Sequence, residues 1–184
     1  PPATEPDAGD SPAAVARLYR QRCFYRSEGW WTYEFCVNKH VRQFRQQPGK
    51  AALPGAADPD SPEYYLGHVS EQAANQLPYV AKLHSKDPRR SYAAASYTEG
   101  SVGGCDLVDG GGPGLKRGTE VRMTCAADGQ DRIVSVQEVQ VCRYRLMFAS
   151  SKLCKLDEFA RPDEKAQEIV CWYADDEEAA EVEA

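Results

Sequence analysis

The sequence predicts an all-β domain, and three observations support this prediction. Several short stretches alternate apolar and polar residues with the period of a strand, most clearly residues 117–125. Segments rich in glycine and proline separate these stretches, as the turns of an all-β fold require. Seven cysteines lie between residues 23 and 171, and none forms a Cys-x-x-Cys pair. Such spacing is more typical of a disulfide framework than of a zinc site.

The length of 184 residues predicts one domain with flanking tails. A disulfide framework requires an oxidising compartment, which is the secretory pathway or a bacterial periplasm. The chain begins Pro-Pro-Ala-Thr-Glu without a basic-then-apolar segment, so we expect no signal peptide in this sequence. No apolar run approaches membrane-spanning length, and we therefore expect a soluble lumenal or extracellular protein with no direct membrane insertion.

The net charge of −6 comes from one end of the chain. Residues 175–184 contain six acidic residues and no basic one, and the remainder balances 22 basic against 22 acidic residues. A balanced charge gives no electrostatic footprint for a nucleic acid or an anionic membrane. We therefore expect no nucleic-acid partner.

The N-terminal part begins with residues 1–13, which are rich in proline, alanine, aspartate and glycine and predict a disordered leader. Residues 14–20 favour a short helical turn. Residues 22–35 mix aromatic and polar side chains as a strand or hairpin does. Residues 46–62 contain four prolines and two glycines, which predict an exposed loop insertion.

The rest of the chain continues the strand pattern, with further strand-like segments at residues 64–69, 79–84, 90–97, 117–125 and 132–148. In the clearest of these, one face is predicted to carry Arg117, Thr119, Val121, Met123 and Cys125. The domain is expected to span residues 14–160. Residues 161–174 favour a short helix, because apolar residues recur there at helical spacing, and residues 175–184 form an acidic tail.

The stretch that points to function is residues 29–36, which carries the adjacent tryptophans Trp30 and Trp31. Adjacent residues of a strand point to opposite faces, so a regular sheet could bury only one of them in a given core. A flat indole beside hydrogen-bonding side chains suits a pyranose ring, which has an apolar face and a polar hydroxyl rim. The pair therefore suggests a carbohydrate-binding surface.

Four motifs follow one another along the chain, and the first of them begins in this stretch. They are Trp30-Trp31-x-Tyr-Glu-x-Cys36 with Gln43 seven residues later, Arg117-x-Thr-x-Val-x-Met-x-Cys125, Glu138-x-x-x-Cys142-x-Tyr144, and then Cys154. Over residues 22–155 this pattern resembles the mannose 6-phosphate receptor homology (MRH) domain. The resemblance implies a flattened antiparallel β-barrel or sandwich. It also implies the disulfides Cys23–Cys36, Cys105–Cys142 and Cys125–Cys154.

The resemblance further implies a mannose site, formed by Gln43, Arg117, Glu138 and Tyr144. The chemistry of these residues suits that role. An arginine offers a fixed fork of donors, a glutamate offers acceptors, and the amide and phenol each provide a donor and an acceptor. No cofactor, metal or catalytic residue is expected. Since Arg117 would serve a ligand, Arg117→Ala is expected to abolish binding with little loss of folding.

The paired tryptophans resemble those of the endoplasmic-reticulum lectins of glycoprotein quality control, the osteosarcoma-amplified lectin and erlectin type. This resemblance implies that Trp30 and Trp31 select the extended glycan. It implies a non-catalytic lectin of the endoplasmic-reticulum lumen, acting in endoplasmic-reticulum-associated degradation. The implied ligands are trimmed high-mannose N-glycans with exposed α1,6-linked mannose on misfolded glycoproteins, and the implied partners are a membrane ubiquitin ligase complex and its adaptor.

Several alternatives remain open from the residues alone. Arg117 and Glu138 could form an ordinary surface ion pair, Gln43 could be solvated, and the tryptophans and Tyr144 could be core packing. Within the family, the domain could be of the glucosidase II β-subunit type or of the mannose 6-phosphate receptor type. A glycosidase needs two carboxylates, and Glu138 could pair only with Glu34 or Asp106. Two features depart from the family pattern: a longer loop between Cys105 and Arg117, and the odd cysteine Cys171.

Overall fold

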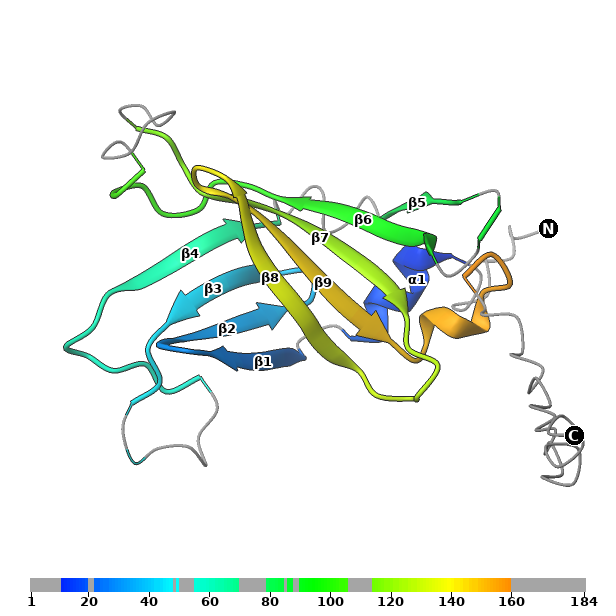
Figure 1. Cartoon of the computed structure of the whole chain (residues 1–184), viewed down its shortest axis with the longest axis horizontal. Coiled ribbons are helices and arrows are strands. Elements are labelled where there is room, and N and C mark those ends of the chain that lie inside the picture. Colours follow the sequence, from blue (N-terminus) through cyan, green and yellow to red (C-terminus); the bar gives the residue numbers. More distant parts are fainter. Residues whose placement is uncertain are drawn as a thin grey trace, which may run out of the picture.

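The computed structural model consists of two β-sheets packed face to face, which confirms the all-β prediction (Figure 1). The structure describes residues 11–19, 22–47, 49, 55–69, 79–84, 86–87, 90–105 and 114–159. The predicted helix at residues 161–174, the acidic tail and Cys171 lie outside the described residues, as do residues 1–10 of the predicted leader.

The first sheet is antiparallel, and its strands follow the sequence in the order β1-β2-β3-β4. The strands are β1 (Cys23–Glu28), β2 (Trp31–Cys36), β3 (His40–Phe44) and β4 (Glu63–His68). Gly29 and Trp30 form the tight turn between β1 and β2, and Gly29 has a φ of +60°, a conformation that glycine adopts without a steric penalty. The first sheet is therefore a simple meander, because each connection joins neighbouring strands.

The second sheet is mixed, with the strand order β5-β6-β7-β9-β8. Its strands are β5 (Val80–Lys82), β6 (Tyr92–Tyr97), β7 (Gly118–Cys125), β8 (Arg132–Gln140) and β9 (Arg143–Ser150). β9 lies between β7 and β8 and runs parallel to β7. The expectation of purely antiparallel strands is therefore wrong at this pair, because the β8–β9 hairpin folds back so that β9 and not β8 pairs with β7.

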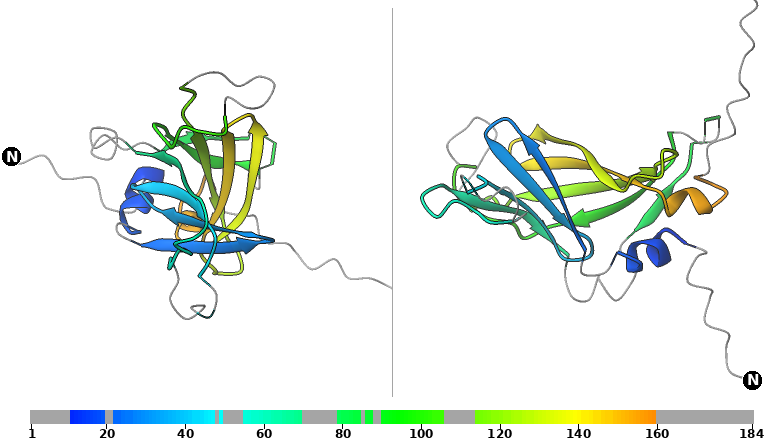
Figure 2. Two further views of the ribbon diagram at one scale, coloured as in Figure 1. Left: turned by 90° about the vertical axis from the view of Figure 1, so that its left-hand side faces the viewer. Right: turned by 90° about the horizontal axis from the view of Figure 1, so that it is seen from below.

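The core lies between the inner faces of the two sheets (Figure 2). Phe35 and Val41 from the first sheet and Val121 and Leu146 from the second are fully buried. On β7 the residues alternate between buried and half-buried, as the sequence predicted. The two sheets also meet through a β-bridge between the end of β4 and the residue after β6. Burial of these apolar faces holds the sandwich together.

The helix α1 (Pro12–Arg17) lies at one end of the sandwich, beside the 3-10 turn η2 (Leu153–Lys155) (Figures 1 and 2). The Ser11 hydroxyl accepts a hydrogen bond from the Ala14 amide at 3.1 Å and caps the helix. The helix therefore starts before the predicted residue 14, and the last two residues of the predicted leader belong to it. The Ser-Pro start signal explains this difference. No helix in the described part of the chain is long and apolar enough to cross a membrane.

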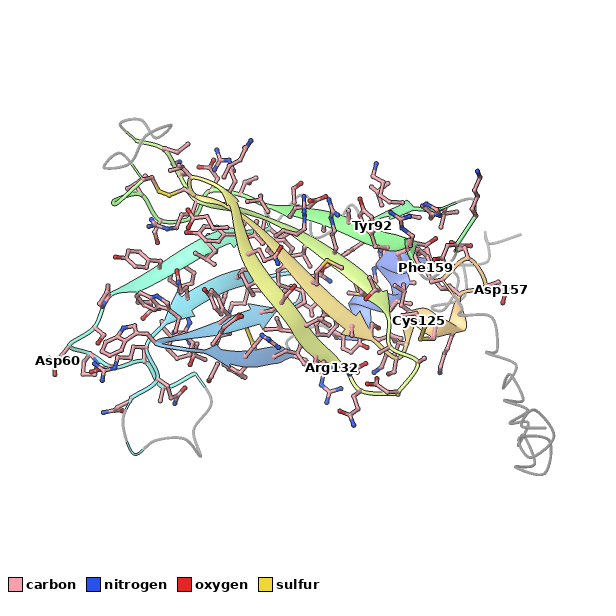
Figure 3. All side chains as sticks on the ribbon, viewed as in Figure 1. Asp60, Tyr92, Cys125, Arg132, Asp157 and Phe159 are labelled. Carbon is pink, nitrogen blue, oxygen red and sulfur yellow. A yellow bond between two sulfur atoms is a disulfide. The ribbon has the colours of Figure 1, made fainter. Side chains whose placement is uncertain are left out.

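The three predicted disulfides, Cys23–Cys36, Cys105–Cys142 and Cys125–Cys154, are confirmed. The first joins cross-strand partners of β1 and β2. The third joins the end of β7 to η2, and Figure 3 shows Cys125 near Phe159 at the α1 end of the sandwich. The second joins the segment before β7 to the β8–β9 turn, at the opposite end of those strands.

Part of the predicted loop insertion lies against the outer face of the first sheet. Gln46 forms a β-bridge with Ala57, and Arg42 donates a hydrogen bond to the Gly55 carbonyl at 3.0 Å. Beneath this segment, Glu34 is only 5% exposed. Its carboxylate accepts hydrogen bonds from His40 at 2.6 Å and from Arg42 at 2.9 Å. The described part of the insertion thus covers a polar network and is not simply solvated.

Stability is expected to depend on the charge of Glu34. Burial acts to raise the pKa of Glu34, but hydrogen bonds from His40, Arg42 and Tyr25 outweigh it and lower the pKa from 4.5 to about 2. Because the folded-state pKa is depressed, the ionised Glu34 carboxylate stabilises the fold above pH 4.5. This stabilisation is lost as the pH falls from 4.5 to about 2. Glu34→Gln should lower the free energy of unfolding at pH 7 by about 2 to 3 kcal/mol, measured by urea denaturation.

The matched control is Glu28→Gln, because Glu28 is half-exposed and pairs with Arg26 at the surface. This variant should change the free energy of unfolding by less than about 1 kcal/mol. If Glu34→Gln kept the full acid dependence of the unmodified protein, the buried network would not be the source of that dependence.

Candidate functional site

The inner face of the first sheet carries polar and aromatic side chains at the end of the sandwich that lies away from α1. Tyr33, Gln43 and Tyr64 are cross-strand neighbours on β2, β3 and β4. Because side chains alternate along a strand, Tyr33 shares a face with the core residue Phe35 and with Trp31. These residues therefore continue the inner face beyond the apolar core.

The second sheet presents its own residues at the same end. Arg117 directly precedes β7, Glu138 lies near the end of β8, and Tyr144 lies at the start of β9. Tyr144 is the cross-strand partner of both Thr119 and Glu138. The period of two places Arg117, Glu138 and Tyr144 on the inner face, opposite the residues of the first sheet. Thus the fold brings together Gln43, Arg117, Glu138 and Tyr144, although the first of these is 74 residues from the second.

Arg117 is 7% exposed and is held from two sides. Its Nη1 donates hydrogen bonds to the carbonyl oxygens of Ser101 at 3.1 Å and Gly103 at 2.8 Å. Its Cζ lies 4.3 Å from the centroid of the Tyr64 ring, in a cation–π contact. The orientation of the guanidinium is thereby fixed before any ligand arrives. Arg117 therefore also has a structural role, and the expectation that Arg117→Ala would cost little folding stability does not fit its surroundings.

Tyr144 interacts with both Arg117 and Glu138. The Cys142 amide donates a hydrogen bond to Glu138 Oε1 at 2.7 Å. The pKa of Tyr144 is raised, first by burial and then by the negative charge of Glu138, while Arg117 acts in the opposite direction. Tyr144 therefore stays a neutral phenol that can both donate and accept a hydrogen bond between a cation and an anion.

Tyr33 is influenced electrostatically by residues of both sheets. Gln43 Nε2 donates a hydrogen bond to the Tyr33 hydroxyl at 3.4 Å. The pKa of Tyr33 is raised by burial first, and Glu28, Tyr144 and Glu138 also raise it. The amide from the first sheet and the carboxylate from the second therefore act on the same phenol.

Sequence reasoning missed Tyr33 and Tyr64 as site residues. The signal for Tyr33 was present, because it follows Trp31 by two residues and so shares its face on a strand. Tyr64 could not be found in this way. Its contacts with Arg117 and Trp31 depend on the pairing of β3 with β4 and on the packing of the two sheets.

The two tryptophans occupy different environments. Trp31 is on β2, and its ring centroid lies 6.1 Å from that of Tyr64. Trp30 is in the β1–β2 turn, 59% exposed, with the Arg45 guanidinium 3.8 Å from its ring centroid. The expectation that both lie on one strand and point to opposite faces is therefore wrong, because the chain turns at Trp30. Both nevertheless lie at the same end of the sandwich, and Trp30 forms an exposed aromatic surface at the tip of the hairpin.

The polar groups of this site suit a ligand with several hydroxyls. A guanidinium, a carboxylate, an amide and phenols provide donors and acceptors side by side, and Trp31 and Tyr64 add apolar ring surface. Glu34, which the sequence offered as a second carboxylate for hydrolysis, lies on the outer face in the network with His40 and Arg42. Asp106 is outside the described residues. Glu34 therefore cannot flank a sugar bond together with Glu138.

A hollow of about 640 Å³ opens close to this site but is distinct from it. Gly118, Glu120 and Arg143 line it together with Arg117 and Tyr144. Gly118 and Glu120 belong to the outer face of β7, and no described residue of the first sheet lines the hollow. We therefore place the candidate site at the inner faces, where both sheets contribute.

One group of potential metal ligands exists among the described residues, and it lies outside the candidate site. Glu34, Cys36 and His40 have ligand atoms within 4.8 Å of one another. The Cys36 sulfur is bonded to Cys23, and the other two groups are hydrogen-bonded to each other. The donor set is therefore that of a structural network and not of a metal centre.

Comparisons with known proteins show what the chain is similar to. A family model described as glucosidase II beta subunit-like protein matches residues 21–104. The protein OS-9 homolog of rice (Oryza sativa subsp. japonica) is 32% identical over 147 residues, which are 78% of this chain and 45% of the relative. The Arabidopsis thaliana protein OS-9 homolog is 30% identical over 145 residues, which are 79% of this chain and 46% of the relative. The chain thus spans slightly less than half the length of these relatives.

Among solved structures, the chain is similar to the solution structure of the MRH domain of Yos9 complexed with α3,α6-Man5. The match has a TM-score of 0.60 at 18% sequence identity, and it covers 82% of this chain and 87% of the other. At this level of identity the likeness concerns the fold, which agrees with the two-sheet architecture described above.

Proposed function

The chain carries an MRH domain of the OS-9 type, and from this premise we propose that it is a non-catalytic lectin for mannose-rich glycans. The observation that carries the proposal is the gathering of Gln43, Arg117, Glu138 and Tyr144 at the open end of the sandwich. Three of these residues are positioned by neighbours: Glu138 accepts a hydrogen bond from the Cys142 amide, Gln43 donates one to the Tyr33 hydroxyl, and the Arg117 guanidinium lies over the Tyr64 ring. The first sheet contributes the amide and the aromatic surface, and the second contributes the charged pair and a phenol.

Arg117 and Glu138 would bind neighbouring hydroxyls of one mannose, since one offers donors and the other acceptors. Tyr144 and Gln43 would bind the remaining hydroxyls. A sugar with one hydroxyl turned the other way would leave a buried group of the site unpaired, at about 1 to 3 kcal/mol for each group. Selectivity for mannose would therefore come from the fixed positions of these groups.

The finer proposal concerns the glycan beyond this mannose. Trp30 and Trp31 would contact the further residues of trimmed high-mannose N-glycans that expose α1,6-linked mannose. The wide exposure of Trp30 at the hairpin tip supports this role, as does the ligand of the Yos9 domain, α3,α6-Man5. By resemblance to its relatives, the protein would act in the endoplasmic-reticulum lumen. There it would bind misfolded glycoproteins and deliver them, through an adaptor, to a membrane ubiquitin ligase complex for degradation.

A second candidate is a glucosidase II β-subunit role, because the family model that matches residues 21–104 has that description. Such a domain would use the same mannose site, so the mannose-binding groups do not discriminate between the two. The paired tryptophans favour the quality-control lectin. The length and branching of the preferred glycan would separate the two roles.

The proposal predicts the outcome of a glycan array. The folded, oxidised protein should bind oligomannose glycans with a terminal α1,6-linked mannose, because the site matches mannose hydroxyls and Trp30 and Trp31 extend it. Phosphorylated mannose should not be preferred. EDTA should leave the signal unchanged, because no step of the proposed recognition uses a metal. Absence of any oligomannose signal from a folded sample would refute the proposed function.

A further inference from the structure

The Cys142 residue connects several parts of the proposed mannose site. It lies in the two-residue turn between β8 and β9. Its amide donates a hydrogen bond to Glu138 Oε1 at 2.7 Å, and its carbonyl accepts one from the Gly118 amide at 3.0 Å. Gly118 directly follows Arg117, and the Cys142 sulfur is bonded to Cys105. One residue therefore contacts the carboxylate, the strand that carries the guanidinium, and the preceding loop.

The segment before Cys105 positions Arg117. The carbonyl oxygens of Ser101 and Gly103 accept hydrogen bonds from Arg117 Nη1. Ser101 also anchors the loop to β4, because its amide donates to the Tyr65 carbonyl at 2.7 Å and its Oγ accepts from the Tyr65 amide at 2.9 Å. Beyond Ser101 the chain reaches Cys105 through two glycines with positive φ. The disulfide thus anchors this segment two residues after Gly103.

Cys142 adopts an unfavourable backbone conformation in this tight turn. Its φ is +56°, in the left-handed region that a residue with a β-carbon rarely adopts. Without the covalent bond, the turn could relax toward a more common conformation. That relaxation would move the amide that holds Glu138.

We infer that the Cys105–Cys142 disulfide is a positioning element of the sugar site, which holds Glu138 and the Arg117 loop in the geometry that binds the glycan. This inference rests on the proposed lectin function. Both cysteines are almost completely buried, so the bond acts through the residues it holds and does not contact the ligand.

The Cys125–Cys154 disulfide provides a matched control. It closes a loop of similar length, with a sequence separation of 29 against 37 for Cys105–Cys142. Chain-entropy arguments therefore give the two bonds similar effects on stability. Cys125 is at the other end of the eight-residue strand β7, about 25 Å from the site at the rise per residue of a strand. Removing it should change stability without moving Arg117 or Glu138.

The test compares Cys105→Ser/Cys142→Ser with Cys125→Ser/Cys154→Ser. Calorimetry measures the Kd for α3,α6-Man5, circular dichroism checks the fold, and urea denaturation measures stability. Both double variants should lose stability to a similar degree. Only the first should bind more weakly, by at least about tenfold, because displaced groups no longer meet the sugar hydroxyls. A variant that combines Cys105→Ser/Cys142→Ser with Glu138→Gln should lose less binding free energy than the sum of the two separate losses, because the disulfide acts partly through Glu138.

Equal affinity of the two double variants, or fully additive losses with Glu138→Gln, would overturn the inference. If the unmodified protein fails to bind, the proposed function fails first. If the Cys105→Ser/Cys142→Ser variant does not fold, Gly104→Ala and Gly129→Ala replace the pair, since both glycines have a φ of +75°. Only Gly104 lies in the segment that holds Arg117, since it follows Gly103, whose carbonyl accepts a hydrogen bond from Nη1; the strain of a side chain at this φ would therefore act on that carbonyl. Gly104→Ala should then weaken binding while Gly129→Ala does not, and unchanged binding by both would also overturn the inference.

Discussion

Replacing Arg117 with alanine is expected to abolish oligomannose binding and also to lower the free energy of unfolding. The variant removes the cation that interacts with Tyr144, and it removes two hydrogen bonds to the Ser101–Gly103 segment. Charge-assisted hydrogen bonds contribute about 1.5 to 3 kcal/mol each, so the loss of two to a sugar should weaken binding by about a thousandfold or more. Calorimetry with an oligomannose glycan measures this effect.

The expected loss of stability for Arg117→Ala is about 1 to 3 kcal/mol, because two carbonyls lose a buried donor and Tyr64 loses a cation–π partner. Arg132→Ala is the matched control, since Arg132 pairs with Asp128 at the surface of the opposite end of the sheet (Figure 3). This control should keep both affinity and stability. Normal glycan binding by a folded Arg117→Ala variant would show that the mannose site lies elsewhere.

Replacing Gly67 with alanine is expected to have the largest effect on stability. A Cβ at this position would lie 2.4 Å from the Tyr97 carbonyl oxygen, and the φ of +148° is itself unfavourable for alanine. Tyr97 cannot easily give way, because its hydroxyl accepts a hydrogen bond from the Asn38 amide and bonds to the Tyr79 hydroxyl. The free energy of unfolding of this variant should fall by about 4 kcal/mol or more, as measured by urea denaturation, or the variant should fail to fold.

Gly129→Ala separates the two causes of this effect. Gly129 has a positive φ, and an added Cβ there would meet no atom within 4 Å. The free energy of unfolding of Gly129→Ala should therefore fall by only about 1 kcal/mol, which is the cost of the backbone conformation alone. If Gly67→Ala and Gly129→Ala lost equal free energies of unfolding, the close approach of β4 to Tyr97 would not be the reason that residue 67 must be glycine.

Much of the architecture was readable from the sequence because the relevant signals are local. The alternation along residues 117–125 predicted which side chains of β7 share a face, and the alternating burial of this strand confirms it. The strand-like segments correspond to strands, with boundaries that shift by a few residues. The start of α1 was misjudged although Ser11 and Pro12 form a recognisable capping pattern.

Other features depend on contacts between residues far apart in the chain. The spacing of the cysteines left the disulfide pairing open, and the family resemblance supplied it. Nothing in the local sequence indicated that β9 would pair in parallel with β7. The surroundings of Arg117 likewise depend on packing, because its partners Ser101, Gly103 and Tyr64 come from a loop and from the other sheet.

The sequence by itself determined the class of fold, the cysteine framework and the residue types that could bind a mannose. The fold class and the cysteine framework follow from alternation, composition and cysteine spacing, whereas the mannose-binding residues are what the resemblance to a known family implies. Only the tertiary structure decided that Tyr64 joins the site, that Trp30 lies in a turn, and that Cys142 connects Glu138 to the Arg117 loop. The physical reason is that contacts between the two sheets join residues far apart in the chain, and their positions depend on how the whole core is buried.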